Sequence, residues 1–176
     1  GIIPAVVVGL AMGEETANAL RLPALIAVNL IVFGIVLGIA DRTGSQTRSV
    51  MDVSIKEALL IGAAQALALI PGTSRSGITM SAGLFLGLNR HEAARYSFLM
   101  GVPVTAAACA HGALELYKSG EAFAWADFAI GAGVSAVAGI ACIHFLLHFL
   151  RRLGLMPFVW YRIALGVVVL ALVYLR

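Results

Sequence analysis

Charged residues are scarce in this chain. They make up 12% of its 176 residues, whereas hydrophobic residues make up 61%; an average soluble protein has about a quarter charged residues. Its apolar runs approach or exceed the roughly 18 to 20 residues that a helix needs to cross a ~30 Å hydrocarbon core. The composition therefore excludes an ordinary soluble domain and predicts an integral membrane protein built from helices.

Cysteines are few, and basic patches interleaved with aromatic residues are absent from the sequence. The two cysteines, Cys109 and Cys142, lie in apolar stretches, and we expect them to be packing residues. Lys and Arg number 12 against 9 acidic residues, but they are grouped in short loops without interleaved aromatics. This pattern indicates orientation in a bilayer and an anionic substrate, and it argues against nucleic-acid binding.

The first residues, GIIPAVVVGLAMG, have no initiator methionine and no signal-peptide pattern. They provide only about a dozen apolar residues, roughly 18 Å of helix, which is too short to span a membrane. We therefore expect residues 1–176 to form a single transmembrane domain that is the C-terminal part of a longer protein.

Four later apolar segments are long enough to be membrane-spanning helices. They are residues 22–40, 92–117, 126–149 and 157–175. Gly101 and Pro103 predict a kink in the second segment. Small residues recur at 129–141, a spacing that lets helices approach closely. Packing inside one bundle and the contact face of a homodimer both fit this pattern.

A re-entrant helical hairpin is predicted over residues 54–88. Ser54 and Glu57 form a capping box at the start of an apolar helix that stops before Pro71. The next apolar piece, residues 78–88, gives only ~16 Å of helix, so it cannot cross the bilayer. The tip at 71–77 then lies within the membrane, where irregular backbone is tolerated only if it is buried in protein or lines a wet cavity.

With a re-entrant hairpin, the basic residues divide unequally between the two membrane faces. One face receives Arg42, Arg48, Lys56, Arg90, Arg95, Arg151, Arg152 and Arg162. The other receives Arg21, Lys118 and Arg176. The positive-inside rule makes the first face cytoplasmic, so the hairpin should enter from the cytoplasm. Arg75 remains as an intramembrane arginine.

The tip sequence, PGTSRSG, predicts an oxyanion site for phosphate or diphosphate. Backbone N–H groups in a Gly-bounded turn and at the start of the following half-helix attract anions, and the guanidinium of Arg75 matches phosphate oxygens bidentately. Ser74 and Ser76 fit helix capping as well as ligand binding, and Arg75 also fits a structural role in which it is neutralised by tip carbonyls. Gln65 either crosses the hairpin or reaches the ligand. The predicted substrate-binding residues are Gln65, Gly72, Thr73, Ser74, Arg75, Ser76 and Gly77.

Other polar pairs are weaker candidates. His91 and Glu92 fit a helix cap, whereas the pairs His111 with Glu115 and His144 with His148 are four residues apart on one helical face. Two ligands do not make a metal site, so no metal ligand is assigned in this chain. Aromatic residues near helix ends predict interfacial anchors: Trp125, Trp160, Tyr161 and Tyr174.

Residues 58–104 resemble the second signature region of the undecaprenyl-diphosphate phosphatases, the bacitracin-resistance family of bacterial inner-membrane enzymes. The likeness consists of PGTSRSG, the GxxQ element at Gly62 and Gln65, and the following YSFLMGVP. The resemblance implies hydrolysis of the C55 lipid carrier diphosphate to the monophosphate that peptidoglycan synthesis reuses. It also implies two inverted repeats, of which this chain is one half, with the site where two re-entrant tips meet.

The resemblance places Arg75 on the family's essential arginine, and Ser74 is the second catalytic candidate. A glutamate-rich stretch with a Ser/Thr pair and a histidine, the family's other signature, has no counterpart here. The resemblance thus implies that the missing N-terminal repeat supplies the nucleophile and most ligands of a divalent cation, Mg or Ca. The alternative is a transporter or flippase for an anionic lipid or small molecule, since half-helix dipoles also build transporter sites.

Overall fold

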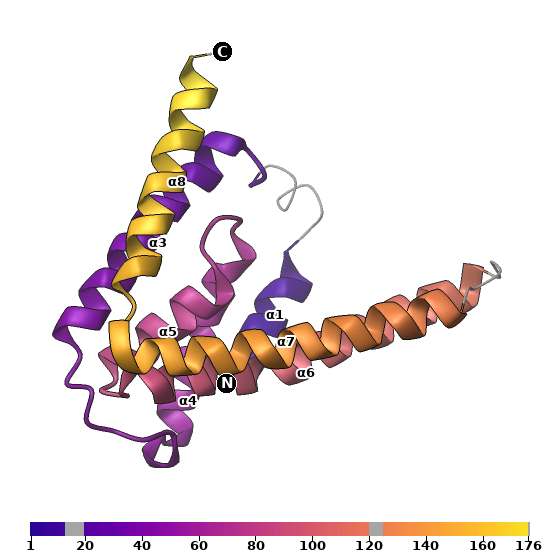
Figure 1. Cartoon of the computed structure of the whole chain (residues 1–176), viewed down its shortest axis with the longest axis horizontal. Helices are drawn as coiled ribbons and strands as arrows, with labels where there is room; N and C mark the ends of the chain where they lie inside the picture. Colours follow the sequence, from indigo (N-terminus) through magenta and orange to yellow (C-terminus); the bar gives the residue numbers. More distant parts are fainter. Residues whose placement is uncertain (13–19, 120–124, 176) are drawn as a thin grey trace.

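The computed structural model describes residues 1–12, 20–119 and 125–175, which are almost entirely helical (Figure 1). The α-helices are α1 (Ile3–Ala11), α3 (Pro23–Thr43), α4 (Ile55–Ala66), α5 (Arg75–Phe85), α6 (Arg90–Ser119), α7 (Trp125–Leu153) and α8 (Met156–Tyr174). Two 3-10 turns, η1 (Val50–Asp52) and η2 (Leu67–Leu69), precede and follow α4.

Four helices, α3, α6, α7 and α8, are long and apolar enough to cross a membrane. This confirms the prediction of an all-α polytopic membrane protein. Pro23 and Pro157 stand in the first turns of α3 and α8, where a proline costs no intrahelical hydrogen bond. Helix α6 continues through Pro103 in the middle of its length.

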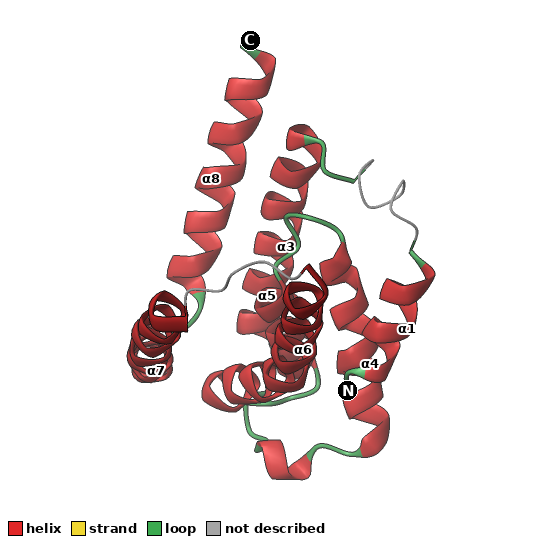
Figure 2. Cartoon of the chain, turned by 90° about the vertical axis from the view of Figure 1, so that its right-hand side faces the viewer, coloured by secondary structure: helices red, strands yellow, loops and turns green. Residues whose placement is uncertain are grey.

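The helices form two groups. α3 and α8 pack side by side, and α5 packs between α3, α4 and α6, with α1 against α4. α6 and α7 run together and extend away from the other helices, which gives the molecule a long arm (Figures 1 and 2). The beginning of α6 and the end of α7 lie in the corner where α3, α5 and α8 meet.

The hydrophobic core occupies this corner. Its buried members join α3, α5, α6, α7 and α8, so they fix the position of α5 relative to the spans. They are Leu37, Ala40, Met80, Leu84, Leu88, Ala93, Ala94, Leu150, Leu155 and Val159. The small-residue segment 129–141 takes no part in this core: a Cβ added at Gly131, Gly133 or Gly139 would meet nothing within 4 Å. The expected close packing of that segment inside the bundle is therefore wrong for the described residues.

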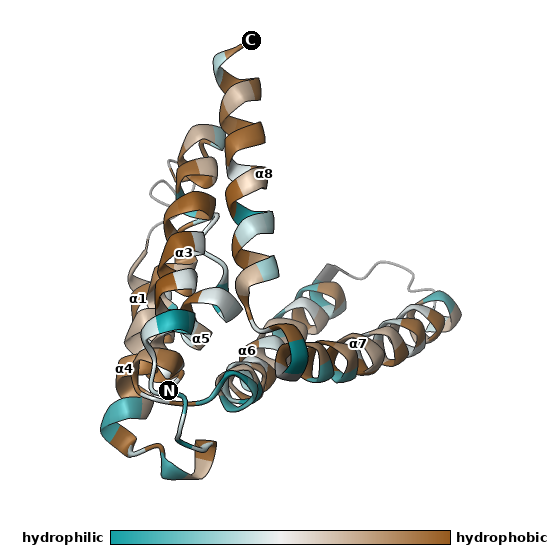
Figure 3. Ribbon diagram, turned by 60° about the vertical axis from the view of Figure 1, so that its left-hand side comes forward, coloured by the Kyte–Doolittle hydropathy of each residue, from teal (hydrophilic) through white to brown (hydrophobic). Residues whose placement is uncertain are grey.

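The two ends of the helical hairpin, α4 and α5, meet at Arg48. Its guanidinium pairs with Glu57 in the first turn of α4 and donates to the backbone oxygen of Leu86 just after α5 (2.8 Å). Its backbone also pairs with Gly87 (2.9 Å) and Asn89 (3.1 Å). Figure 3 shows hydrophilic residues in this loop between α3 and α4 and at the start of α6, and apolar residues along α3 and α8. The hairpin thus leaves and returns to one polar end of the molecule.

Candidate functional site

The hairpin tip turns sharply and then starts α5. Gly72 has φ +90°, and Ser74 has φ +68°. Ser74 is the N-cap of α5, because its Oγ accepts the N–H of Gly77 at 3.2 Å. The helix therefore begins at Arg75, three residues before the predicted start at Ile78. Its first turn contains Arg75, Ser76 and Gly77, which the sequence placed in the loop.

Helix α3 holds one side of the tip. The side-chain amide of Asn29 donates to the backbone oxygen of Pro71 (2.9 Å). A Cβ at Gly72 would lie closer than 3.0 Å to the backbone oxygen of Ile26. Only glycine combines the positive φ with this close approach of two backbones.

Arg162 of α8 holds the other side. Its Nη2 donates to the backbone oxygens of Gly72 (2.8 Å) and Thr73 (2.9 Å), and the residue is only 8% exposed. The assignment of Arg162 to the cytoplasmic face is therefore wrong: it lies about 9 Å along α8 from Met156 at 1.5 Å per residue, level with the tip. The assignment rested on the position of Arg162 near the start of the predicted span 157–175. A charge inside an apolar run is, however, itself a signal of function.

The two arginines at the tip divide the roles that the sequence gave to Arg75. Arg162 neutralises the tip carbonyls, which was the structural alternative for Arg75. The Arg75 guanidinium is exposed and forms no hydrogen bond to another described residue. It lies against α6, where a Cβ added at Gly101 would be 2.8 Å from its Nη2. The positive charge of Arg75 is thus not compensated by a hydrogen bond or ion pair with another described residue.

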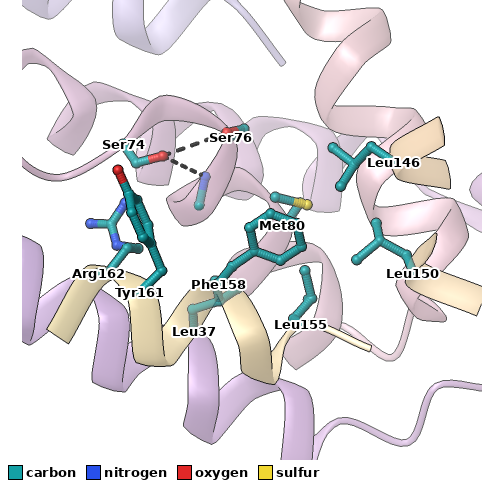
Figure 4. A pocket seen from close by; sticks show the side chains of 11 residues that line it. Leu37, Ser74, Ser76, Met80, Leu146, Leu150, Leu155, Phe158, Tyr161 and Arg162 are labelled. Carbon is teal, nitrogen blue, oxygen red and sulfur yellow. Dashed lines mark hydrogen bonds between the residues drawn. The ribbon is translucent and has the colours of Figure 1, made fainter. Parts of the chain in front are cut away.

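A cavity of about 240 Å³ lies beside the α5 N-terminus, and neither Arg75 nor Gly101 is among the residues that line it. Ser74, Ser76 and Gly77 contribute to its wall, together with Tyr161 and Arg162 of α8 (Figure 4). The hydroxyls of Ser74 and Ser76 are 3.5 Å apart. Tyr161, predicted as an interfacial anchor, lines this cavity while its ring remains mostly exposed.

The remaining predicted site residues lie deeper. Thr73 is fully buried, and its Oγ1 has no partner in the described part of the chain; the Nε of Arg162 is the other such atom. Gln65 is buried in α4 and does not line the cavity. The structure therefore brings Ser74, Ser76 and Gly77 together with Arg162, while Thr73 and Gln65 stand behind them.

Thr79 is a further tip residue that the sequence analysis did not single out. Its Oγ1 bonds to the backbone oxygen of Arg75 (2.9 Å) and to the hydroxyl of Ser97 on α6 (2.7 Å). This contact ties the first turn of α5 to α6. Only its position, four residues after Arg75 on the same helical face, could have indicated it.

No group of three His, Cys, Asp or Glu side chains within the described ranges is placed to hold a metal ion. Asn89 caps α6, because its Oδ1 accepts the backbone N–H of Glu92 (3.0 Å), so His91 and Glu92 lie in the first turn of this helix as predicted. Nδ1 of His91 and Oε1 of Glu92 are 3.1 Å apart, and the Glu92 carboxylate accepts the backbone N–H of Val50 (3.0 Å). His111 and Glu115 form an exposed pair (3.7 Å). The described residues that line the cavity at the tip offer arginine, N–H donors and neutral hydroxyls but no carboxylate, a set that does not fit a divalent cation such as Mg²⁺ or Ca²⁺.

Charge is compensated at the polar end of the hairpin. The hydrogen bond from Arg48, followed by bonds from the backbone N–H and hydroxyl of Ser54, lowers the pKa of Glu57 to about 2. The pKa of Arg48 is raised by the same hydrogen bond. Arg90 pairs with the buried carboxylate of Asp41 at the end of α3. Arg48 and Arg90 are thus paired with carboxylates, whereas Arg75 and Arg162 at the tip form no ion pair with a described residue.

Comparison with known proteins agrees with the geometry of the tip. The family model "Bacitracin resistance protein BacA" matches residues 1–168. A protein of Hahella chejuensis named undecaprenyl-diphosphatase is 49% identical over 99% of this chain and 65% of its own length. Proteins of the same name from Teredinibacter turnerae (46% identical; 94% of this chain, 62% of theirs) and Nitrosococcus oceani (47%; 94% and 63%) are also similar.

The chain thus spans less than two thirds of the length of these relatives. The match runs through all the elements that build the tip, from α3 to α8, and it confirms the resemblance carried by PGTSRSG. The protein belongs to the bacitracin resistance protein BacA family.

Proposed function

We propose that this protein forms the diphosphate-binding part of an undecaprenyl-diphosphate phosphatase in the bacterial inner membrane. The observation that carries the proposal is the composition of the α5 N-terminus. The guanidinium of Arg75 and the hydroxyls of Ser74 and Ser76 all lie at this helix start. The printed name of the relatives, undecaprenyl-diphosphatase, supports a lipid diphosphate as the substrate. The reaction would release undecaprenyl phosphate and inorganic phosphate.

The residues of the tip bind and orient the diphosphate. The first N–H groups of an α-helix have no intrahelical acceptor, and its N-terminus carries partial positive charge. Arg75 adds a full charge with a planar fork that matches phosphate oxygens. Because phosphoryl transfer is catalysed mainly by positioning and charge neutralisation, these groups would stabilise the oxygens of the transferred phosphoryl group and of the leaving lipid phosphate.

Arg162 acts on the backbone of the tip. By donating to the oxygens of Gly72 and Thr73, it compensates the partial negative charge of these two carbonyls beside the anion site. Ser74 has a double role, since its Oγ accepts the Gly77 N–H and its hydroxyl hydrogen remains available to a phosphate oxygen.

We further propose that the groups which activate the attacking water lie outside the described residues. The described tip offers no carboxylate or imidazole to accept a proton, and its donor set does not fit the divalent cation, Mg or Ca, that the resemblance implies. We therefore derive no step through such a cation.

The test is phosphate release from undecaprenyl diphosphate in detergent with Mg²⁺. Two proteins would be compared: the chain itself, and a graft in which it replaces the matching 65% of the Hahella chejuensis protein. Arg75→Ala should lower kcat of the active form by roughly 100-fold or more, and Arg75→Lys should not restore it, because an ammonium lacks the planar fork. Arg95→Ala, which removes an exposed arginine of α6, is the matched control.

Each outcome has a distinct meaning. Normal turnover by Arg75→Ala would refute the assignment. Release by the graft alone would support a site completed from outside this chain, whereas release by the chain itself would place every catalytic group within it. Movement of the lipid across sealed vesicles without phosphate release would support the transporter alternative.

A further inference from the structure

The cavity beside the tip has two chemically different ends. Figure 4 shows Ser74, Tyr161 and Arg162 at one end and Leu146 and Leu150 at the other. The apolar wall comes from four different helices, α3, α5, α7 and α8. Its members are Leu37, Met80, Leu146, Leu150, Leu155 and Phe158. A ligand that fills the cavity therefore needs an apolar part joined directly to a polar head.

The polar end is built for an anion. Arg162 is more than nine-tenths buried, and its Nε has no hydrogen-bond partner in the described part of the chain. Its Nη1 would lie 3.5 Å from a Cβ on Gly77, so the guanidinium stands directly beside the first turn of α5. The hydroxyls of Ser74 and Ser76 face the same space. Carboxylates are absent from the lining residues of this cavity.

Arg75 is not among the residues that line this cavity, and its guanidinium lies against Gly101 of α6. The start of α5 therefore has two cations beside it, and of these only Arg162 also borders the apolar wall. A lipid diphosphate has the matching asymmetry, because only one of its two phosphoryl groups carries the chain.

We propose that the cavity between α5, α7 and α8 binds the first isoprene units of the lipid and so sets the direction of the substrate. The phosphate linked to the chain faces Ser74, Ser76 and Arg162, and the terminal phosphate faces Arg75. This inference rests on the proposed function. A volume of about 240 Å³ is below the roughly 300–1,000 Å³ of sites that enclose a whole drug-sized ligand, so most of the C55 chain remains outside the cavity, in the bilayer.

The bilayer is as apolar as the cavity, so the cavity adds little hydrophobic driving force. Its contribution is orientation and shape, and the sharpest test is therefore to fill it. Leu146→Trp adds bulk at a partly buried lining position. Leu172→Trp makes the same change at an exposed position of α8 and is the matched control.

Two non-hydrolysable probes distinguish the contribution of the lipid chain to binding from that of the diphosphate head. They are farnesyl methylenediphosphonate and methyl methylenediphosphonate, which share the same head. Binding to this chain would be measured in lipid nanodiscs. Leu146→Trp should weaken the farnesyl probe by about tenfold, as expected for overpacking a filled site, and leave the methyl probe within about twofold. Leu172→Trp should change neither.

A second measurement does not depend on how the variant folds. A diazirine on the first isoprene unit of the farnesyl probe should label peptides of α7 and α8 in the unaltered chain, around Leu146 and Phe158. Labelling confined to α1 or α4, or an unchanged farnesyl affinity in a folded Leu146→Trp protein, would overturn the inference.

The two proposals fail differently. In one case the methyl probe binds, Arg75→Ala abolishes that binding, and the diazirine labels helices other than α7 and α8. The proposed function then stands, and the proposed position of the isoprene chain is wrong. If neither probe binds the unaltered chain, the proposed function fails and this inference fails with it.

Discussion

Two regions of the molecule contain the same residue types in different surroundings. One is the corner that holds the hairpin, and the other is the arm formed by α6 and α7. Glycine shows this most clearly. In the corner, a Cβ at Gly72 would collide with the backbone of α3, and one at Gly101 would press on the Arg75 guanidinium. In the arm, a Cβ at Gly112 or Gly133 would meet nothing within 4 Å. An added Cβ thus meets a neighbour at these glycines of the corner, a backbone at Gly72 and a flexible side chain at Gly101, and meets none at those of the arm.

The polar residues differ in the same way. Asp41 in the corner is 2% exposed and paired with Arg90, whereas His111 and Glu115 in the arm pair with both side chains about 70% exposed. Composition alone suits the arm to an apolar environment, but specific contacts are needed to position the tip. Substitutions should therefore have large effects in the corner and small effects in the arm.

The largest contrast should come from alanine at Gly72 and at Gly133. Gly72→Ala forces a side chain into a positive φ and against the backbone of Ile26, and it should destabilise the protein by about 3 kcal/mol or more. Gly133→Ala should be neutral or slightly stabilising, since alanine favours helix by about 1 kcal/mol. Thermal midpoints in detergent check both, and equal midpoints would contradict the contrast.

The sequence could predict the four long helices because they follow from length, whereas the re-entrant path of the α4–α5 hairpin in a membrane stays a prediction. A run of about 20 apolar residues crosses a membrane and a run of 11 does not, whatever the run packs against. The predicted start of α5 is three residues too late for a local reason. The apolar run begins at Ile78, whereas the cap formed by Ser74 starts the helix at Arg75.

Arg162→Met should have the second-largest effect. The substitution keeps the length of the side chain but leaves the backbone oxygens of Gly72 and Thr73 without their donor, which should cost about 2–3 kcal/mol. Arg162→Lys should recover only part of this loss, because one ammonium lacks the fork that reaches both oxygens. Arg152→Met, at an exposed position near the end of α7, should leave the thermal midpoint unchanged.

The contacts of Arg162 show why the site was only partly predictable. PGTSRSG is contiguous, so an anion-binding tip can be predicted from the letters alone. Arg162 is 90 residues from Gly72 in the sequence, and only the packing of α8 beside α3 and the tip brings the two together. The direction in which Arg75 leans, toward Gly101, depends likewise on where α6 begins.

A smaller effect, on activity alone, is expected at Gly101. Its added Cβ would meet the flexible end of Arg75 and no backbone of a neighbouring element, so Gly101→Ala should leave the thermal midpoint unchanged or raise it slightly. The displaced guanidinium should nevertheless lower turnover of the grafted enzyme several-fold, since small misplacements of a positioning group are costly. Gly112→Ala is the control on the same helix. A parallel loss of stability and activity would contradict this separation.

The smallest expected effect is confined to acid. Glu57 lies outside the four candidate spans, and the hydrogen bond from Arg48, ahead of those from Ser54, lowers its pKa to about 2; an unperturbed glutamate has a pKa of about 4.3. A lowered pKa means that the folded state favours the charged carboxylate, so this contribution to stability is complete above about pH 5 and is lost as the pH falls toward 2. Glu57→Gln should lower the thermal midpoint at neutral pH and flatten its decline below pH 5. Glu115→Gln, in the exposed pair of the arm, should leave the thermal midpoint at neutral pH unchanged. An acid decline that persists in full in Glu57→Gln would contradict this assignment.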